Sequence, residues 1–239
     1  MHETVKRIVE PFLTEVDRVL GDGYSALLYG SAARGDFVEG RSDVNLMLIL
    51  DDVAPARLKA LGSAFAGWRK AAQEPPLVVS RAEWGAASDV FPLEITDMRE
   101  AYQVLRGPDP LEGIGVARAD LRRALERELR GKLLRLRQGY VALADDPERL
   151  GAMLSASLST MLVLVRGLLA LTGRAAPRDP LELTVAAAQV AGLDGEPLAA
   201  VARRRGERRW RCEARECTEY LDAVARLARF VDQLQTGDQ

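Results

Sequence analysis

One short stretch divides this chain into two halves with different sequence patterns. Gly107-Pro108-Asp109-Pro110 places two prolines and a glycine within four residues, a combination that marks a turn or linker. Before it, short apolar runs bounded by glycines alternate with helical periodicity, which indicates an α/β layout. After it come long amphipathic segments without a strand pattern, which indicate a helical bundle. The 239 residues therefore predict two domains, 1–110 and 111–239.

The charges divide the chain in the same way. Residues 1–112 carry 12 Lys or Arg and 18 Asp or Glu, whereas residues 113–239 carry 21 and 17. Six of the arginines lie within residues 203–211, around Trp210. This segment could bind an acidic partner, an RNA backbone or a triphosphate, but a solvated helix end in an arginine-rich chain explains it as well. No nucleic-acid-binding motif accompanies it, so nucleic acid is not an expected partner.

Several classes of protein are excluded by what the sequence lacks. The one histidine, His2, lies at the terminus, which argues against Ser-His-Asp and Cys-His catalysis and a histidine-rich metal site from this chain alone. Cys212 and Cys217 are expected to be reduced helix residues of a cytosolic protein, although a redox pair or half of a zinc site also fits them. The longest uncharged run, residues 150–165, is shorter than the roughly 18 residues that a membrane span needs. We therefore expect a cytoplasmic protein without a membrane partner.

Periodicity predicts the individual elements. The apolar spacing predicts a helix over residues 3–20, stopped by Gly21, and another over 55–73. Four strands are expected at residues 24–29, 44–50, 77–80 and 91–97. In the second half, helices are expected at residues 116–144, 148–171, 180–191, 197–205 and 213–234.

A candidate phosphate-binding loop follows the first strand directly. Gly30 permits a sharp turn from strand to helix, and Ser31 is a good N-cap. Amide groups at the start of the helix would face an anion, and Ser31 and Arg34 could add phosphate contacts. An ordinary capped helix after a strand is the alternative interpretation. A Walker loop is excluded, because no G-K-[ST] sequence follows the glycines.

Polar side chains near two of the predicted strands could complete such a site. Asp43 and Asn45 are two residues apart and therefore share a face, opposite Val44 and Leu46. Glu94 lies between the apolar residues of the strand expected at 91–97. Asp43, Asn45 and Glu94 together would offer Mg²⁺ the oxygen ligands that it prefers. The alternative is a solvated Asp at a strand start and a Glu that faces the edge of the sheet.

The combined pattern resembles the polymerase-β-like nucleotidyltransferase superfamily, especially its small bacterial members. Gly30-Ser31 with Gly35, followed by Ser42-Asp43-x-Asn45-Leu46, is similar to the superfamily's h-G-[GS] and h-[DE]-h-[DE]-h motifs. The resemblance covers roughly residues 24–97 and implies an α/β (α+β) nucleotidyltransferase domain with a mixed sheet before the helical bundle. It also implies that a hydroxyl attacks the α-phosphate of a nucleoside triphosphate, with Mg²⁺ held by three carboxylates.

This resemblance implies a role for each matching residue. Gly30, Ser31, Arg34 and Ser42 would bind the nucleotide, Asp43 and Glu94 would be catalytic, and Asp43, Asn45 and Glu94 would hold Mg²⁺. Asn45 departs from the pattern, because an amide supplies no negative charge where a carboxylate is expected. The expected function is transfer of a nucleotide, most plausibly AMP from ATP, to a small-molecule or protein acceptor, with catalysis impaired at Asn45. The alternative is a catalytically degenerate nucleotide-binding regulator or antitoxin-like module. The sequence leaves a homo-oligomer open.

Overall fold

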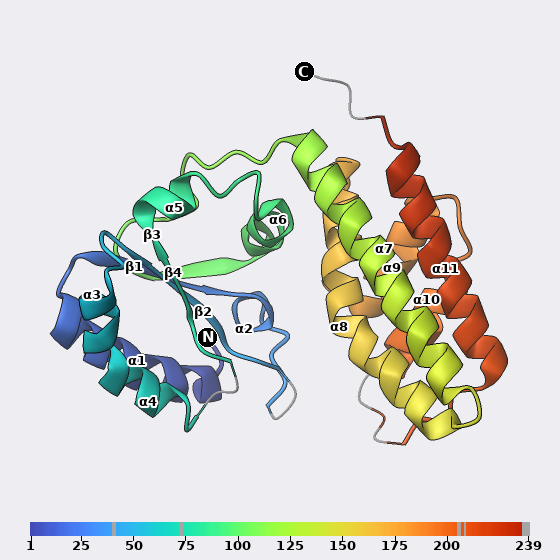
Figure 1. Ribbon diagram of the computed structural model, residues 1–239, viewed down its shortest axis with the longest axis horizontal. Coiled ribbons are helices and arrows are strands. Elements are labelled where there is room, and N and C mark those ends of the chain that lie inside the picture. The colour runs from blue at the N-terminus through green and yellow to red at the C-terminus, as the bar shows by residue number, and fades with distance from the viewer. Residues whose placement is uncertain (40–41, 72–73, 205–206, 208, 236–239) are drawn as a thin grey trace. The chain divides into compact units, whose positions relative to one another are not determined.

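The computed structural model of the chain describes residues 1–39, 42–71, 74–204, 207 and 209–235 (Figure 1). The chain forms two compact units, Met1–Gly115 and Val116–Gln239. The first combines a four-stranded sheet with helices, whereas in the second every regular element among the described residues is a helix. The predicted fold class is confirmed.

The sheet of the first unit is mixed. Its strands are β1 (Tyr24–Tyr29), β2 (Asn45–Leu50), β3 (Leu77–Ser80) and β4 (Tyr102–Arg106), in the order β3-β2-β1-β4. β1 runs antiparallel to both β2 and β4, and β2 runs parallel to β3. The register of β1 and β2 pairs Tyr29 with Asn45. The end of the first strand therefore lies beside the start of the second, where the sequence analysis places the polar motifs.

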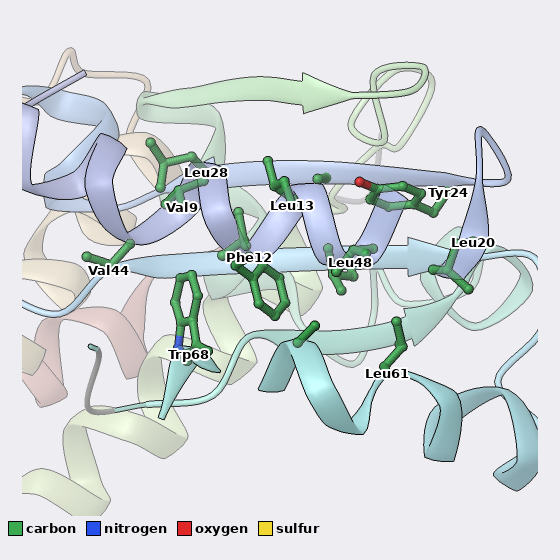
Figure 2. Close-up of a cluster of buried hydrophobic side chains, with 14 of the residues drawn as sticks. Val9, Phe12, Leu13, Leu20, Tyr24, Leu28, Val44, Leu48, Leu61 and Trp68 are labelled. Atoms are coloured by element: carbon green, nitrogen blue, oxygen red, sulfur yellow. The ribbon is translucent and has the colours of Figure 1, made fainter. Parts of the chain in front are cut away.

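One face of this sheet is covered by α1 (Glu3–Leu20), whose bounds agree with the predicted helix. Figure 2 shows Val9, Phe12 and Leu13 of this helix next to Leu28 and Leu48 of the strands, in a cluster of buried apolar side chains. The predicted helix 55–73 is two short helices, α3 (Pro55–Ala60) and α4 (Gly62–Trp68), of which α4 packs Ala64 and Trp68 into the same core. Residues 72 and 73 lie outside the described residues. Burial of this apolar stripe, which is worth about 25 cal/mol per Å², fixes which sheet face is inside.

Short helices surround the rest of the sheet: α2 (Ser31–Arg34), α5 (Arg81–Gly85) and α6 (Pro92–Glu100). The prediction of a strand at residues 91–97 is wrong, because this segment belongs to α6. Pro92 favours a helix here, since a proline in the first turn loses no hydrogen bond and its φ is already helical. The fourth strand is instead β4, which follows directly after α6.

The second unit is a bundle of five helices in the described residues. They are α7 (Arg118–Leu143), α8 (Pro147–Leu171), α9 (Pro180–Val190), α10 (Glu196–Arg203) and α11 (Ala214–Gln233). Asp146 and Asp179 cap α8 and α9 by accepting backbone N–H groups, each directly before a proline at the first helical position. Cys212 and Cys217 are free thiols, both buried near the start of α11.

The core of this bundle is α8, which contacts all four of its other helices. Among the described residues α8 alone is long and apolar enough to cross a membrane, with a mean hydropathy of 1.8. However, 67% of its apolar window is buried inside the protein. This burial is typical of the core helix of a soluble bundle.

The arginine-rich segment 203–211 is largely paired with acidic side chains. Arg203 pairs with Glu196, and Arg204 pairs with Glu207 at 3.3 Å and with Glu216 at 3.5 Å. Arg204 also lies 5.5 Å above the buried ring of Trp210. Arg205 and Arg208 lie outside the described residues. The pairing favours the interpretation as a structural helix end, because a nucleic-acid surface needs unpaired cations.

Candidate functional site

The turn after β1 depends on a glycine. Gly30 has a φ of 72° and a ψ of −150°, in the region that only glycine adopts without strain. A Cβ placed on it would lie 2.6 Å from Nδ2 of Asn45. The backbone carbonyl of Gly30 accepts the N–H groups of Ala33 and Arg34, so α2 starts immediately after the turn. Both the conformation and the space at this position therefore exclude a side chain.

Asn45 is the residue that occupies this space. It is the first residue of β2, opposite Tyr29, and its side chain lies against Gly30, the residue that follows β1. Val44 and Leu46 are buried in the core beneath α1, so Asn45 faces the other side of the sheet, as predicted. Asp43 lies two residues earlier, just before the strand, and is half-buried. The structure thus brings Gly30 and Asn45 into contact, with Asp43 next along the chain.

Glu94 lies on a helix and not on a strand, but it still lies close to the end of β1. The pKa of Tyr29 is raised to about 12, first by burial of its hydroxyl and then by the negative charges of Asp97 and Glu94. These two carboxylates are three residues apart on α6 and so share one face of the helix. Asp97 was not among the predicted site residues, because on a strand it would have faced away from Glu94.

Arg34 links the turn to α6. Its Nε lies 3.6 Å from Oδ1 of Asp36, and its Nη1 lies 3.6 Å from Oδ2 of Asp97. Only 13% of the side chain is exposed. The guanidinium predicted to contact phosphate is thus held between two carboxylates. In this conformation it positions α2 against α6.

Ser42 makes two hydrogen bonds with Val38 in the segment that connects the turn with β2. Its hydroxyl accepts the N–H of Val38 at 3.0 Å, and its own N–H donates to the Val38 carbonyl at 2.8 Å. At the N-terminus His2 caps α1, because its Nδ1 accepts the N–H of Thr4. Its ring lies 5.4 Å from that of Phe37, in the same connecting segment.

Few of the expected metal ligands lie on the described strands. The four described strands contain neither Asp nor Glu, so a third strand with a central carboxylate is absent from them. Among the described residues no group of three or more His, Cys, Asp or Glu side chains is placed to hold a metal ion. Asn45 itself offers a neutral oxygen where the family motif has a charged carboxylate, and carboxylates bind Mg²⁺ more strongly.

Known proteins resemble this chain in structure but not detectably in sequence. No family model and no curated protein matches the sequence. A crystal structure of the spectinomycin adenyltransferase AAD(9) from Enterococcus faecialis, with ATP and spectinomycin, matches with a TM-score of 0.58 at 13% sequence identity. The match covers 91% of this chain and 98% of that one, and that enzyme is a polymerase-β-like nucleotidyltransferase. This chain has the nucleotidyltransferase fold.

The likeness extends beyond the sheet. A match over 91% of the chain must include much of the helical unit as well as the first unit. The expected resemblance is therefore confirmed for the fold, including the order of a nucleotidyltransferase-type unit before a helical one. At 13% identity the similarity says nothing of individual residues, so the roles of Asp43, Asn45 and Glu94 depend on the geometry described above.

Proposed function

We propose that this nucleotidyltransferase-fold protein binds ATP at the Gly30–Gly35 turn and transfers AMP slowly to a small-molecule acceptor. The observation that carries the proposal is the contact between Gly30 and Asn45, which joins the two sequence motifs at one end of the sheet. Support for the nucleotide and for the kind of acceptor comes from the neighbour crystallised with ATP and spectinomycin.

Each residue at the turn has a role in this proposal. Gly30 lets the triphosphate approach the backbone, and Ser31 contributes its hydroxyl and amide. The acceptor oxygen forms a bond to the α-phosphorus while the bond to the β-phosphate oxygen breaks, releasing diphosphate, and Glu94 accepts the acceptor's proton. Asp43, with the oxygen of Asn45, can hold at most one Mg²⁺ whose other ligands are phosphate oxygens. Negative charge that develops on the phosphate oxygens in the transition state is then less well neutralised. The transfer rate falls tenfold for each ~1.4 kcal/mol of transition-state stabilisation that is lost.

A second candidate is a nucleotide-binding protein that has lost transfer altogether. The absence of Asp and Glu from the four described strands favours it, because no carboxylate of a hydrogen-bonded strand is then available to complete the site. Such a protein would bind ATP as a regulator or as an antitoxin-like module.

One assay separates the two candidates. ATP labelled at the α-phosphate is incubated with Mg²⁺ and a small-molecule extract, using wild type, Asn45→Asp and Asp43→Asn. We expect a weak labelled product with wild type, at least tenfold more with Asn45→Asp, and none with Asp43→Asn. If ATP binds but no variant transfers label, the regulator is supported. If ATP does not bind to wild type at all, both candidates are wrong.

A further inference from the structure

A surface pocket on the helical unit is lined by three arginines from two helices. Arg130, Leu133 and Arg137 come from α7, and Ala225, Ala228 and Arg229 come from α11. These helices pack side by side in Figure 1. The pocket holds about 180 Å³, and no acidic residue lines it. With about 30 Å³ for each water molecule, it has room for a small ligand of several heavy atoms.

The charges at this pocket are only partly neutralised. Arg130 is fixed by Glu126 at 2.8 Å and by Asp232 at 3.0 Å. For Arg137 and Arg229 the structure shows no ion pair with any described residue. Other arginines of the same two helices do have acidic partners, as in the pairs Arg122–Glu126 and Arg226–Asp222. Two unpaired cations thus converge on one pocket from segments about 90 residues apart in sequence.

The apolar residues that line the pocket leave the positive charge of the arginines uncompensated. Leu133 and Ala228 are buried, and neither side chain offers a hydrogen bond that could compensate the guanidinium groups. Apolar surface beside the exposed guanidinium groups of Arg137 and Arg229 reduces the screening of their charge by water. Guanidinium groups present forked N–H donors that match the oxygens of a phosphate.

We propose that this pocket binds a small phosphate oxyanion carrying at least two negative charges, such as diphosphate or the phosphoryl tail of a nucleotide. Arg137 and Arg229 supply the unpaired charge, and Arg130, held by its two carboxylates, supplies a preorganised donor. This site belongs to the helical unit alone and does not require that the chain transfers nucleotides.

The test is calorimetric titration of the full chain with sodium diphosphate, inorganic phosphate and ATP at low ionic strength. We compare wild type with Arg137→Gln/Arg229→Gln, and with Arg135→Gln as the matched control. Arg135 is an exposed arginine of α7 that does not line the pocket. We expect diphosphate affinity to fall at least tenfold in the double variant and to stay within twofold in the control, with all three proteins equally helical by circular dichroism.

The outcomes also distinguish the sources of the anion. If the pocket takes a nucleotide tail, wild type binds two ATP molecules and the double variant binds one. If it takes free diphosphate alone, ATP stoichiometry is the same in both while diphosphate binding is lost. Equal weakening in the control, or no diphosphate binding to wild type, would overturn the proposal. A failure of ATP to bind anywhere would remove the proposed transfer but leave the diphosphate result standing.

Discussion

At the scale of single residues, the decisive pair is Gly30 and Asn45. An aspartate at position 45 would place a negative charge directly against the turn where a triphosphate is proposed to bind. The asparagine removes that charge while keeping nearly the same shape. The turn can therefore hold its backbone conformation without a metal ion to neutralise a second carboxylate.

A second residue, Lys132, carries a prediction about pH. Its ammonium is buried in the helical unit and donates to the Ser157 carbonyl at 3.0 Å. Burial, with a smaller contribution from the nearby Arg135 charge, lowers its pKa from 10.5 to about 8, against the opposing effect of Glu128. Below about pH 8 the lysine is charged in both states, and its burial then costs roughly 3 kcal/mol. Between pH 8 and 10.5 the unfolded chain binds more protons, so this cost is relieved as the pH rises.

We therefore expect Lys132→Met to raise the free energy of unfolding at pH 7 by about 1–3 kcal/mol, the lost hydrogen bond offsetting part of the gain. The difference from wild type should shrink toward pH 10, as measured by urea denaturation at both pH values. Lys59→Met, at an exposed position of α3, is the control and should show no such convergence. A stability difference that stays constant with pH would show that the buried ammonium is not its cause.

At the scale of elements, the sequence predicts the structure best where apolar spacing is long or strictly alternating. The helix at 3–20 and the strands at 24–29 and 77–80 have the bounds that periodicity predicts. Residues 91–97 do not, because Leu93 and Ile95 are two residues apart, as on a strand, whereas Ile95 and Met98 are three apart, as on one face of a helix. Pro92 is the signal that could have decided between them. Glu94 and Asp97 share one face only because the segment is a helix, so a predicted strand could not place them together.

The contact between α8 and the segment before α11 gives a prediction at this scale. A Cβ on Gly151 would lie 2.1 Å from the backbone oxygen of Trp210, so Gly151→Ala must displace that segment. We expect a loss of about 1–3 kcal/mol in unfolding free energy by chemical denaturation. Gly131→Ala in α7 is the matched change, because its nearest neighbour is the flexible end of Arg135 at 3.6 Å. It should leave stability equal or improved by up to about 1 kcal/mol, and equal losses in both variants would contradict this account.

At the scale of the whole molecule, near-neutrality conceals two differently charged units, each with its own core. The first unit extends a few residues past the predicted turn, because Trp84 donates to the Pro110 carbonyl and Arg99 to that of Leu111. These two hydrogen bonds attach the residues after the turn to the first unit. No local sequence pattern predicts them, because the donors lie far from the acceptors in sequence.

Separate cores predict separate folding. We expect residues 116–239, expressed alone, to give a helical circular dichroism spectrum and a single cooperative thermal transition, since α8 already buries its apolar surface within this unit. Residues 1–115 expressed alone serve as the comparison. A helical unit that exposes apolar surface and binds a hydrophobic dye without a thermal transition would show that it depends on the first unit.

The placement of Glu94 and Asp97 on α6 has a consequence for how activity can change over evolution. A carboxylate on a central strand is held by the hydrogen-bonded ladder on both sides. On α6 its direction depends instead on how Leu93, Ile95 and Met98 pack beneath the helix. Enlarging or trimming these apolar side chains would turn both acids relative to the end of β1 while the sheet stays as it is. For the proposed transfer, substitutions in the hydrophobic interior would therefore move the proposed base Glu94 without replacing any polar residue.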